Sequence, residues 1–584
     1  MKSGKVAVLT LLIFIVSVSM LSTDVEYCSA TLNKFKSYEE LKEFLQYRVH
    51  EYEPYEILPS MELQSGLREL YGLSANDYSK TNVQVEGVDE ADIVKTDGEY
   101  IYVISDQKVV VVRAYPVEEA AVLSRIAVNG TLKQIFVNED HLILFYENGS
   151  SYETKTFVNV YNVADRQNPT LRREDAVDGR YFSSRMIGNY VYVVVRKSAR
   201  LVEDEVDLPR VYSEGECKVI PAAEIYHSDI ADYGYIFTTI MAVNVQDDGQ
   251  EPTYETVLSG CTTNMYVSLR NIYLAIGYGG RTLLHRIHIE NGEISYVADG
   301  ETPGTVLNQF SMDEYEGYFR IATTSRMSYE DNPSLRLLLQ NNMYVLNMEL
   351  EIVGEIEEIA PGETIHSARF MGDKCYLVTF RKTDPFFVIE LAEPYDPKIL
   401  GELKISGYSD YLHLYDQNHV IGVGKETVPA EQGDFSWYQG VKISLFDVSD
   451  LSQPKEMAKY EIGDRGTDSP VLRDHKAFLF DKEKNLLVLP VSVTQRENPN
   501  DPPYTPGKTV WQGAYVFAVS LSLDKKLKLE GTITHIENGD VHDAKHHITR
   551  ALYIGDVLYT ISNTKIKMNS LFDLSEINEL YLNK

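Results

Sequence analysis

Cationic and imidazole side chains recur at one kind of position in this sequence, in or beside the strand-like segment that begins each of a series of repeated units. If those segments surround a common opening, the positive groups converge there and concentrate an anionic ligand. The alternative is that they pair with neighbouring acids such as Asp92, Asp97 and Asp474. The side chains concerned are Lys95, Lys133, Arg185, His366, Arg369, Arg473, His475, His547 and Arg550.

Two kinds of site can be built from this set. The candidate ligand-binding residues are Arg369, Arg473, His475, His547 and Arg550. An enzymatic alternative uses His475, Asp474 and His547 as acid and base in a hydrolase or lyase that acts on an extracellular polymer. The motifs HExxH and GxSxG are both absent, which excludes a zincin site and an α/β-hydrolase site.

Carboxylates at short spacing form the candidate metal site. Asp89, Glu90 and Asp92, with Glu86 nearby, supply the oxygen ligands that a hard cation such as calcium requires. The same residues could instead form a turn that leads into the first strand. A histidine-rich run at 542–547 has the spacing of a zinc-binding pair, but we expect it to form an irregular loop before a strand, with solvated side chains.

The elements that carry these residues come from a repeat. Nine times, a turn is followed by an alternating run of Tyr, Val, Leu and Ile with the length of a strand. Self-similarity at about 40 to 50 residues, built from strands, predicts a propeller, in which each sheet covers its neighbours. The nine segments are 98–104, 138–146, 188–194, 270–277, 315–323, 372–380, 416–424, 484–491 and 555–561.

A second marker follows the third strand of several units. A Pro lies seven residues after an acid or amide that can cap the turn, and it prevents the strand from continuing. The pairs are Asn162 and Pro169, Glu390 and Pro397, and Asp447 and Pro454. Long insertions at 203–232, 327–340, 427–439 and 495–513 are predicted loops, where binding residues often lie.

Composition limits the partners and the location. The chain has 584 residues, with 87 acidic and 55 basic side chains and a net charge of −32, which would repel nucleic acid. Lys2 and Lys5 precede an apolar run at 6–21 and the small pair Ser29-Ala30, which is the pattern of a secretory signal peptide. An uncleaved membrane anchor is the alternative. We therefore expect a secreted or cell-surface protein.

The region between this segment and the first repeat favours helix. Ser37 and Glu40 have the spacing of a capping box, and Leu41 and Leu45 then share one face with other apolar residues. A second short helix is predicted at 61–71. We expect these helices to pack on the outside of the propeller or to close one end.

An oxidising location would allow covalent modification. Cys217 and Cys261 are the candidate disulfide pair, whereas Cys375 lies in a strand segment and is expected to be a buried thiol. Asn129 and Asn148 begin glycosylation sequons in turn-like contexts and are the candidate glycosylation sites. The sequence has no CxxC, which excludes a zinc ribbon.

The stretch 78–98, YSKTNVQVEGVDEADIVKTDG, resembles the entry motif of a family of secreted proteins with a C-terminal β-propeller distantly related to WD40 repeats. The stretches SARFMG at 367–372, TDP at 383–385, GTDSP at 466–470 and DHKAF at 474–478 resemble the family as well. The resemblance extends from about residue 78 to residue 580. It implies a propeller outside the cytoplasm, and it implies no catalytic residues.

The sequence thus predicts an all-β protein. An eight- or nine-bladed β-propeller of four-stranded blades is expected at 78–584, after a signal peptide at 1–30 and a helical cap at 31–77. The expected function is a non-enzymatic binding scaffold for a protein or a cell-surface polymer, with no cofactor evident apart from the calcium considered above. The alternative function is an extracellular hydrolase or lyase with its site at the propeller channel.

Overall fold

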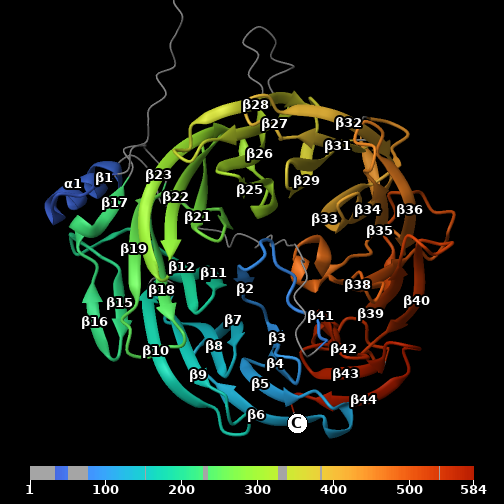
Figure 1. The fold of residues 1–584 in the computed structure, drawn as a ribbon, viewed down its shortest axis with the longest axis horizontal. Coiled ribbons are helices and arrows are strands. Elements are labelled where there is room, and N and C mark those ends of the chain that lie inside the picture. Colours follow the sequence, from blue (N-terminus) through green and yellow to red (C-terminus); the bar gives the residue numbers. More distant parts are fainter. Residues whose placement is uncertain are drawn as a thin grey trace, which may run out of the picture.

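The computed structural model describes residues 33–49, 77–150, 153–227, 234–326, 339–381, 384–433, 435–537 and 539–583. The predicted signal peptide, the second helix at 61–71 and most of the 327–340 insertion lie outside them. Nine sheets of four or more strands are arranged radially in the described residues (Figure 1). The predicted β-propeller of four-stranded blades is confirmed. We number the blades 1 to 9 in chain order.

Each blade is an antiparallel sheet whose strands follow one another outward from the axis. The first strands, which line the centre, are β3 (Val94–Thr96), β7 (Thr131–Asn138), β11 (Arg180–Ile187), β20 (Asn264–Val267), β25 (Met312–Tyr315), β29 (Thr364–Met371), β33 (Tyr408–Asp416), β37 (Leu479–Asp481) and β41 (Arg550–Ile554). The second strands are β4 (Tyr100–Ser105), β8 (His141–Asn148), β12 (Tyr190–Ser198), β21 (Asn271–Tyr278), β26 (Tyr318–Arg326), β30 (Lys374–Phe380), β34 (His419–Pro429), β38 (Leu486–Gln495) and β42 (Val557–Ile561).

The outer half of each blade completes the sheet. The third strands are β5 (Lys108–Arg113), β9 (Lys155–Asn162), β18 (Ile236–Asn244), β22 (Arg281–Glu290), β27 (Leu339–Leu346), β31 (Asp384–Glu390), β35 (Ser436–Asp447), β39 (Lys508–Val519) and β43 (Lys565–Ser570). The outermost strands are β6 (Ala121–Ala127), β10 (Thr170–Asp178), β19 (Thr253–Ser259), β23 (Glu293–Pro303), β28 (Ile352–Ile359), β32 (Lys398–Ile405), β36 (Lys455–Ile462), β40 (Leu527–Ile533) and β44 (Glu576–Tyr581).

The nine repeated segments found in the sequence are the second strands of the nine blades. Strands β8 and β12 each bury five consecutive residues, because neighbouring blades cover both faces of the sheet. The outermost strand β23 instead alternates exposed and half-covered residues over its first part. Two of the three turn caps are also confirmed: the side-chain oxygens of Asn162 and Asp447 accept hydrogen bonds from the backbone N–H groups of Ala164 and Ser449.

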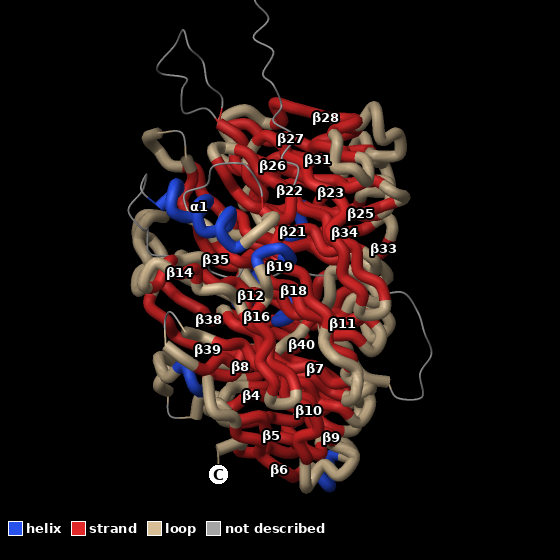
Figure 2. The backbone as a smooth tube through the Cα atoms, turned by 90° about the vertical axis from the view of Figure 1, so that its left-hand side faces the viewer, coloured by secondary structure: helices blue, strands red, loops and turns tan. Residues whose placement is uncertain are grey.

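The sheets of blades 2 and 3 are extended at the outer edge of the ring. Blade 2 gains β15 (Arg210–Ser213) and β16 (Glu216–Val219), and blade 3 gains β17 (Ile225–His227) and β1 (Asn33–Lys34). The predicted first helix is α1 (Tyr38–Val49), and it packs at this edge with Leu41 and Leu45 buried (Figures 1 and 2). Seen from the side, the ring is thinner than it is wide (Figure 2). Within the described ranges, no helix is long and apolar enough to cross a membrane.

The ring closes between blades 1 and 9. The Tyr559 hydroxyl donates to the Ala114 carbonyl at 2.7 Å, and the Ser105 hydroxyl donates to the Asn563 carbonyl at 2.7 Å. No strand is exchanged between these two blades in the described chain, because each takes its four strands from one continuous stretch. Closure therefore depends on side-chain packing and on the segment that precedes blade 1.

Residues 78–92, which we call the axial segment, cross the centre of the ring before blade 1 begins (Figure 1). Tyr78 forms an antiparallel bridge with Ile554 in β41 of blade 9. Strand β2 (Asp89–Glu90) pairs with β11 of blade 3. Asp92 exchanges two backbone hydrogen bonds with Ile135 in β7 of blade 2. The motif that resembles the entry motif of a family is thus the segment that spans the channel.

Gly98, at the end of that motif, tests how tightly the axial segment is held. Its φ is +92°, and an added Cβ would lie 2.6 Å from Cδ1 of Tyr78. Gly317 has a similar φ of +80° with nothing within 4 Å of the added carbon. We predict that Gly317→Ala lowers the free energy of unfolding by about 1 kcal/mol, for the backbone alone. Gly98→Ala should cost about 1 to 3 kcal/mol more, because the methyl overlaps the Tyr78 ring.

Urea denaturation of both variants measures this difference. Equal losses of stability in Gly98→Ala and Gly317→Ala would show that Tyr78 is not fixed against the first hairpin.

Candidate functional site at the propeller axis

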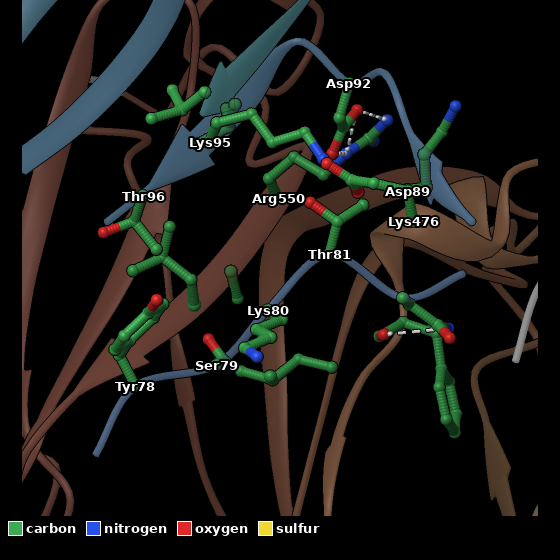
Figure 3. Close-up of a pocket in the computed structure, with 17 residues that line it drawn as sticks. Tyr78, Ser79, Lys80, Thr81, Asp89, Asp92, Lys95, Thr96, Lys476 and Arg550 are labelled. Carbon is green, nitrogen blue, oxygen red and sulfur yellow. Dashed lines mark hydrogen bonds and ion pairs between the residues drawn. The ribbon is translucent and has the colours of Figure 1, made fainter. Parts of the chain in front are cut away.

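Two cavities lie against the axial segment. The smaller one has a volume of about 240 Å³ and is lined by residues 78–82, the first strands of blades 1 and 9, and Lys476. Figure 3 shows Asp89, Asp92, Lys95 and Arg550 grouped on one side of this cavity, with Ser79 and Lys80 on the other. The larger one has a volume of about 410 Å³ and lies against residues 79–83 and 86–89. The axial segment therefore separates two spaces in the channel.

Asp92 and Arg550 form a buried ion pair at the axis in which both carboxylate oxygens are engaged. The Arg550 guanidinium donates to both oxygens of the Asp92 carboxylate, at 2.8 Å from Nη2 and 3.0 Å from Nε (Figure 3). Its Nη2 also donates to Asp474 of blade 8. Burial alone would raise the pKa of Asp474, but Arg550 beside it holds that pKa well below its ordinary value. One arginine of blade 9 thus neutralises carboxylates from the axial segment and from blade 8.

Glu90 is the centre of a second buried network. Its Oε2 lies 3.6 Å from the Arg185 guanidinium of blade 3 and 3.5 Å from Nε2 of His475 in blade 8. Its Oε1 accepts a hydrogen bond from the backbone N–H of Gln84 at 3.0 Å. Burial alone would raise the pKa of Glu90, but Arg185 and His475 outweigh it and lower that pKa. Glu90 is therefore held as a carboxylate in the interior.

The remaining charges of the axis are also engaged. The Lys95 ammonium lies 2.7 Å from Asp89 (Figure 3), and the Lys476 ammonium donates to the Ala91 carbonyl at 3.1 Å. Both lysine residues are less than a tenth exposed. The three carboxylates of the axial segment thus meet cations from blades 1, 3 and 9. The sequence left open whether the channel cations bind an anion or pair with acids such as Asp92 and Asp474. The structure shows the pairing.

The predicted ligand-binding residues fall at different places. Arg550 lines the smaller cavity, and His475 is fully buried beside Glu90. The Arg369 guanidinium lies 5.1 Å from the ring centre of Phe310, and Arg473 is half-exposed and forms an ion pair with Asp468. His547 Nε2 is 3.0 Å from the carbonyl oxygen of Val541. The structure therefore shows a protein partner for each of these five side chains.

The carboxylates predicted to bind calcium do not fit a calcium site. Asp89, Glu90 and Asp92 are each directed to a different cation, Lys95, Arg185 and Arg550 respectively. Across the described ranges, no group of three or more His, Cys, Asp or Glu side chains is arranged to hold a metal ion. In the histidine-rich run, residues 544–546 form a single 3₁₀ turn, η6 (Ala544–His546), before strand β41.

None of the predicted modification sites lines either axial cavity. Cys217 is exposed on β16, Cys261 is half-buried, and both are free thiols, so the structure does not contain the predicted disulfide between them. Cys375 is a free and fully buried thiol, and burial raises its pKa to about 12. Asn129 is exposed between blades 1 and 2 and Asn148 is exposed at the end of β8, which is compatible with their role as candidate glycosylation sites.

Sequence reasoning missed the polar side chains that fix the axial segment. The Asn82 amide donates to the His475 carbonyl at 3.0 Å and to the Tyr411 hydroxyl at 3.2 Å. The Gln84 amide donates to the carbonyl of Gln309 at 2.9 Å. Asn82 and Gln84 lie inside the motif that carried the family resemblance. That motif was therefore the one feature of the sequence that pointed to these two side chains.

It also missed the aromatic wall of the larger cavity. Phe478 and Phe480 line it with His413, whose ring centre lies 4.5 Å and 4.8 Å from those of the two phenylalanines. Burial lowers the pKa of His413 well below its ordinary value, so the ring is neutral at pH 7. Val83, Val88 and Met186 add to the apolar surface of this cavity.

The axial arginine should matter far more to stability than a surface arginine of the same type. Arg550 is 8% exposed and Arg473 is 49% exposed. We predict that Arg550→Met lowers the free energy of unfolding by about 3 to 5 kcal/mol, because Asp92 and Asp474 lose their cation. Arg473→Met should cost less than about 1 kcal/mol. Chemical denaturation of both variants measures this, and similar losses would contradict the buried network.

Glu90 should make the fold sensitive to acid. Because its folded pKa is depressed, it contributes stability above its unfolded pKa of about 4.3, and this contribution is lost as the pH falls through the folded pKa. We predict that Glu90→Gln is less stable than wild type at pH 7 and loses less stability between pH 6 and pH 3. Thermal unfolding across this range measures the effect.

The exposed Glu349→Gln variant is the control and should follow the wild-type curve. Parallel curves for wild type and Glu90→Gln would show that Glu90 is not a buried carboxylate.

The chain has relatives among curated proteins that match most of its length. Among curated proteins, the chain is similar to "Uncharacterized protein MJ1554" of Methanocaldococcus jannaschii, with 30% identity over 570 residues, 83% of this chain and 80% of that protein. It is also similar to an uncharacterised protein of Archaeoglobus fulgidus, with 29% identity over 595 residues, 86% of this chain and 85% of that protein.

Solved structures match more distantly. Apo AztD from Citrobacter koseri matches with 12% identity and a TM-score of 0.34, over 76% of this chain and 95% of that one. Sqt1 from Chaetomium thermophilum matches with 9% identity and a TM-score of 0.35, over 67% of this chain and 83% of that one. The family model described as "Beta propeller domain" matches residues 78–574, from the first residue of the axial segment to blade 9. This chain therefore belongs to the β-propeller domain family.

Proposed function

We propose that this protein is an extracytoplasmic, non-enzymatic binding scaffold and that its ligand site is the larger axial cavity. The observation that carries the proposal is the contrast between that cavity and the channel charges around it. Asp89 and Asp92 are paired with Lys95 and Arg550, whereas the larger cavity keeps an aromatic wall beside a few polar groups, among them Lys80 and Glu86. Such a wall with a few polar groups is typical of a binding pocket.

The lining indicates what kind of group would enter. The phenylalanine side chains of Phe478 and Phe480 and the aliphatic side chains of Val83 and Val88 form apolar surface, and a volume of about 410 Å³ suits a small, mainly apolar group. An apolar side chain or terminal unit presented by a protein or a cell-surface polymer has this size. A partner of this kind would insert one group at the axis and contact the surrounding turns.

The proposed location rests on the sequence. A basic start, an apolar run at 6–21 and a small pair at 29–30 support export from the cytoplasm. The enzymatic alternative has less support at the axis. His475 has no exposed surface, and Asp474 is held as a carboxylate by Arg550, so neither side chain is placed to exchange a proton with a substrate in the cavity.

Filling the larger cavity should abolish ligand binding. Val83 lines only this cavity of the two and is half-buried, so Val83→Trp places an indole in it. We predict that the wild-type protein shows a specific thermal shift with at least one member of a panel of small apolar acids, amines and glycosides, and that Val83→Trp loses this shift. Val297→Trp, at a residue 44% exposed on β23, is the control and should retain it.

A shift that persists in Val83→Trp would place the ligand elsewhere. Turnover of a polymer substrate that is lost in His475→Ala would favour the enzyme instead.

A further inference from the structure

Two of the insertions predicted from the sequence meet at the edge of one face of the ring. The first extends the hairpin between β34 and β35 of blade 7, and the second is the loop between β38 and β39 of blade 8. The Gln439 amide of the hairpin donates to the Pro503 carbonyl of the loop at 3.0 Å. Arg465, between β36 and β37, bridges the two insertions: its carbonyl accepts from the Gly507 N–H of the loop at 2.8 Å, and its guanidinium donates to the Tyr438 carbonyl of the hairpin at 3.1 Å. These bonds hold the two insertions together as one projection.

An exposed cluster of apolar side chains covers this projection. We call Val428, Phe435, Trp437 and Tyr504 the rim cluster. The ring centre of Trp437 lies 4.9 Å from that of Phe435 and 5.7 Å from that of Tyr504. Val428 pairs with Trp437 across the hairpin, so their side chains share one face. The Arg465 guanidinium lies 5.2 Å from the Trp437 ring centre. One of the two tryptophans of the chain is therefore half-buried within this cluster.

The rim cluster has the composition of an interaction surface. Val428, Phe435 and Tyr504 are 39%, 41% and 55% exposed, so much of their apolar surface faces solvent. Contiguous exposed apolar surface on a folded protein marks a site of interaction, and Trp, Tyr and Arg dominate the energetic centres of protein interfaces. The packing of the blades does not require Phe435, Trp437 and Tyr504 to lie together, because all three belong to the two insertions and not to the blade interfaces.

The ring geometry favours a protein partner over a flat sugar chain. The Trp437 ring is at 82° to that of Phe435 and at 57° to that of Tyr504. Rings at such angles do not form a flat platform, and they leave gaps between their faces and edges. A side chain of a partner can enter these gaps and contact two rings at once.

Charge indicates which side chains the partner carries. The protein has a net charge of −32, and its field attracts basic surfaces. Within the described parts of the two insertions, Glu431 and Asp501 have no cation within ion-pair distance, whereas Glu497 is paired with Lys508. Exposed aromatic faces add attraction for Lys and Arg side chains.

We propose that the rim cluster is the docking site for a basic protein segment that presents an apolar side chain flanked by Lys or Arg. The apolar side chain packs between the rings of Phe435, Trp437 and Tyr504. The flanking cations contact the aromatic faces and the carboxylates of Glu431 and Asp501. This site is independent of the axial cavity.

Fluorescence of Trp437 gives a direct test. In the Trp511→Phe background, Trp437 is the single tryptophan of the chain. The probe is a tryptophan-free peptide, four repeats of Lys-Leu-Gly, and the comparison probes are four repeats of Glu-Leu-Gly and the neutral glycan cellohexaose. We expect a saturable change in Trp437 emission with the lysine peptide alone, and an affinity several-fold lower in 0.5 M than in 0.05 M NaCl.

Variants separate the cluster from general charge attraction. Phe435→Ala with Tyr504→Ala should weaken binding of the lysine peptide about tenfold or more, without a change in thermal stability, because both residues are exposed. The control is Tyr395→Ala with Phe572→Ala, at aromatic residues 69% and 84% exposed elsewhere on the ring, and it should bind as wild type does. Equal binding by both double variants, no binding of the lysine peptide, or a response to cellohexaose in its place would each overturn the proposal.

Discussion

A carboxylate in the interior of a protein must meet a cation, and the axis of this propeller is built around that requirement. The axial segment carries Asp89, Glu90 and Asp92 into the centre of the ring, where an uncompensated charge would destabilise the fold by several kcal/mol. The matching cations come from blades 1, 3 and 9, and His475 of blade 8 lies beside Glu90. Blades that are distant in the sequence are thereby held at fixed positions around one short segment, and the shapes of both cavities follow from where that segment lies.

Much of the fold could be predicted because its signals are local. Alternation within nine segments identified the second strand of every blade, and Asn162 and Asp447 cap their turns through atoms two residues away. The site could not be predicted in this way. Asp92 and Arg550 are 458 residues apart, so no spacing rule links them. The basic residues of the first strands suggested an open anion site, but their partners lie in a segment whose path across the channel depends on the closed ring.

The two surfaces that we propose for binding lie on opposite faces of the ring. The cavity walls include Gly188 and Asp481, at the turns that follow first strands. The rim cluster lies where second strands end, and in an antiparallel blade these positions are at opposite ends. An aromatic-walled pocket at the axis and an aromatic edge in an acidic surface suit different chemistries, so one partner on each face can be held at the same time.

The axial segment is translated before every blade, but it pairs with the blade that is translated last. Residues 77–79 leave the ribosome before any blade, yet their backbone partners Tyr553 and Gly555 belong to the last blade, as does Arg550. Until blade 9 has been translated, the early carboxylate of Asp92 has no guanidinium, and the nascent chain holds an open arc with two unpaired sides. Such an arc exposes apolar blade faces for most of translation. The ring can therefore close only after blade 9 has been translated and packs against blade 1.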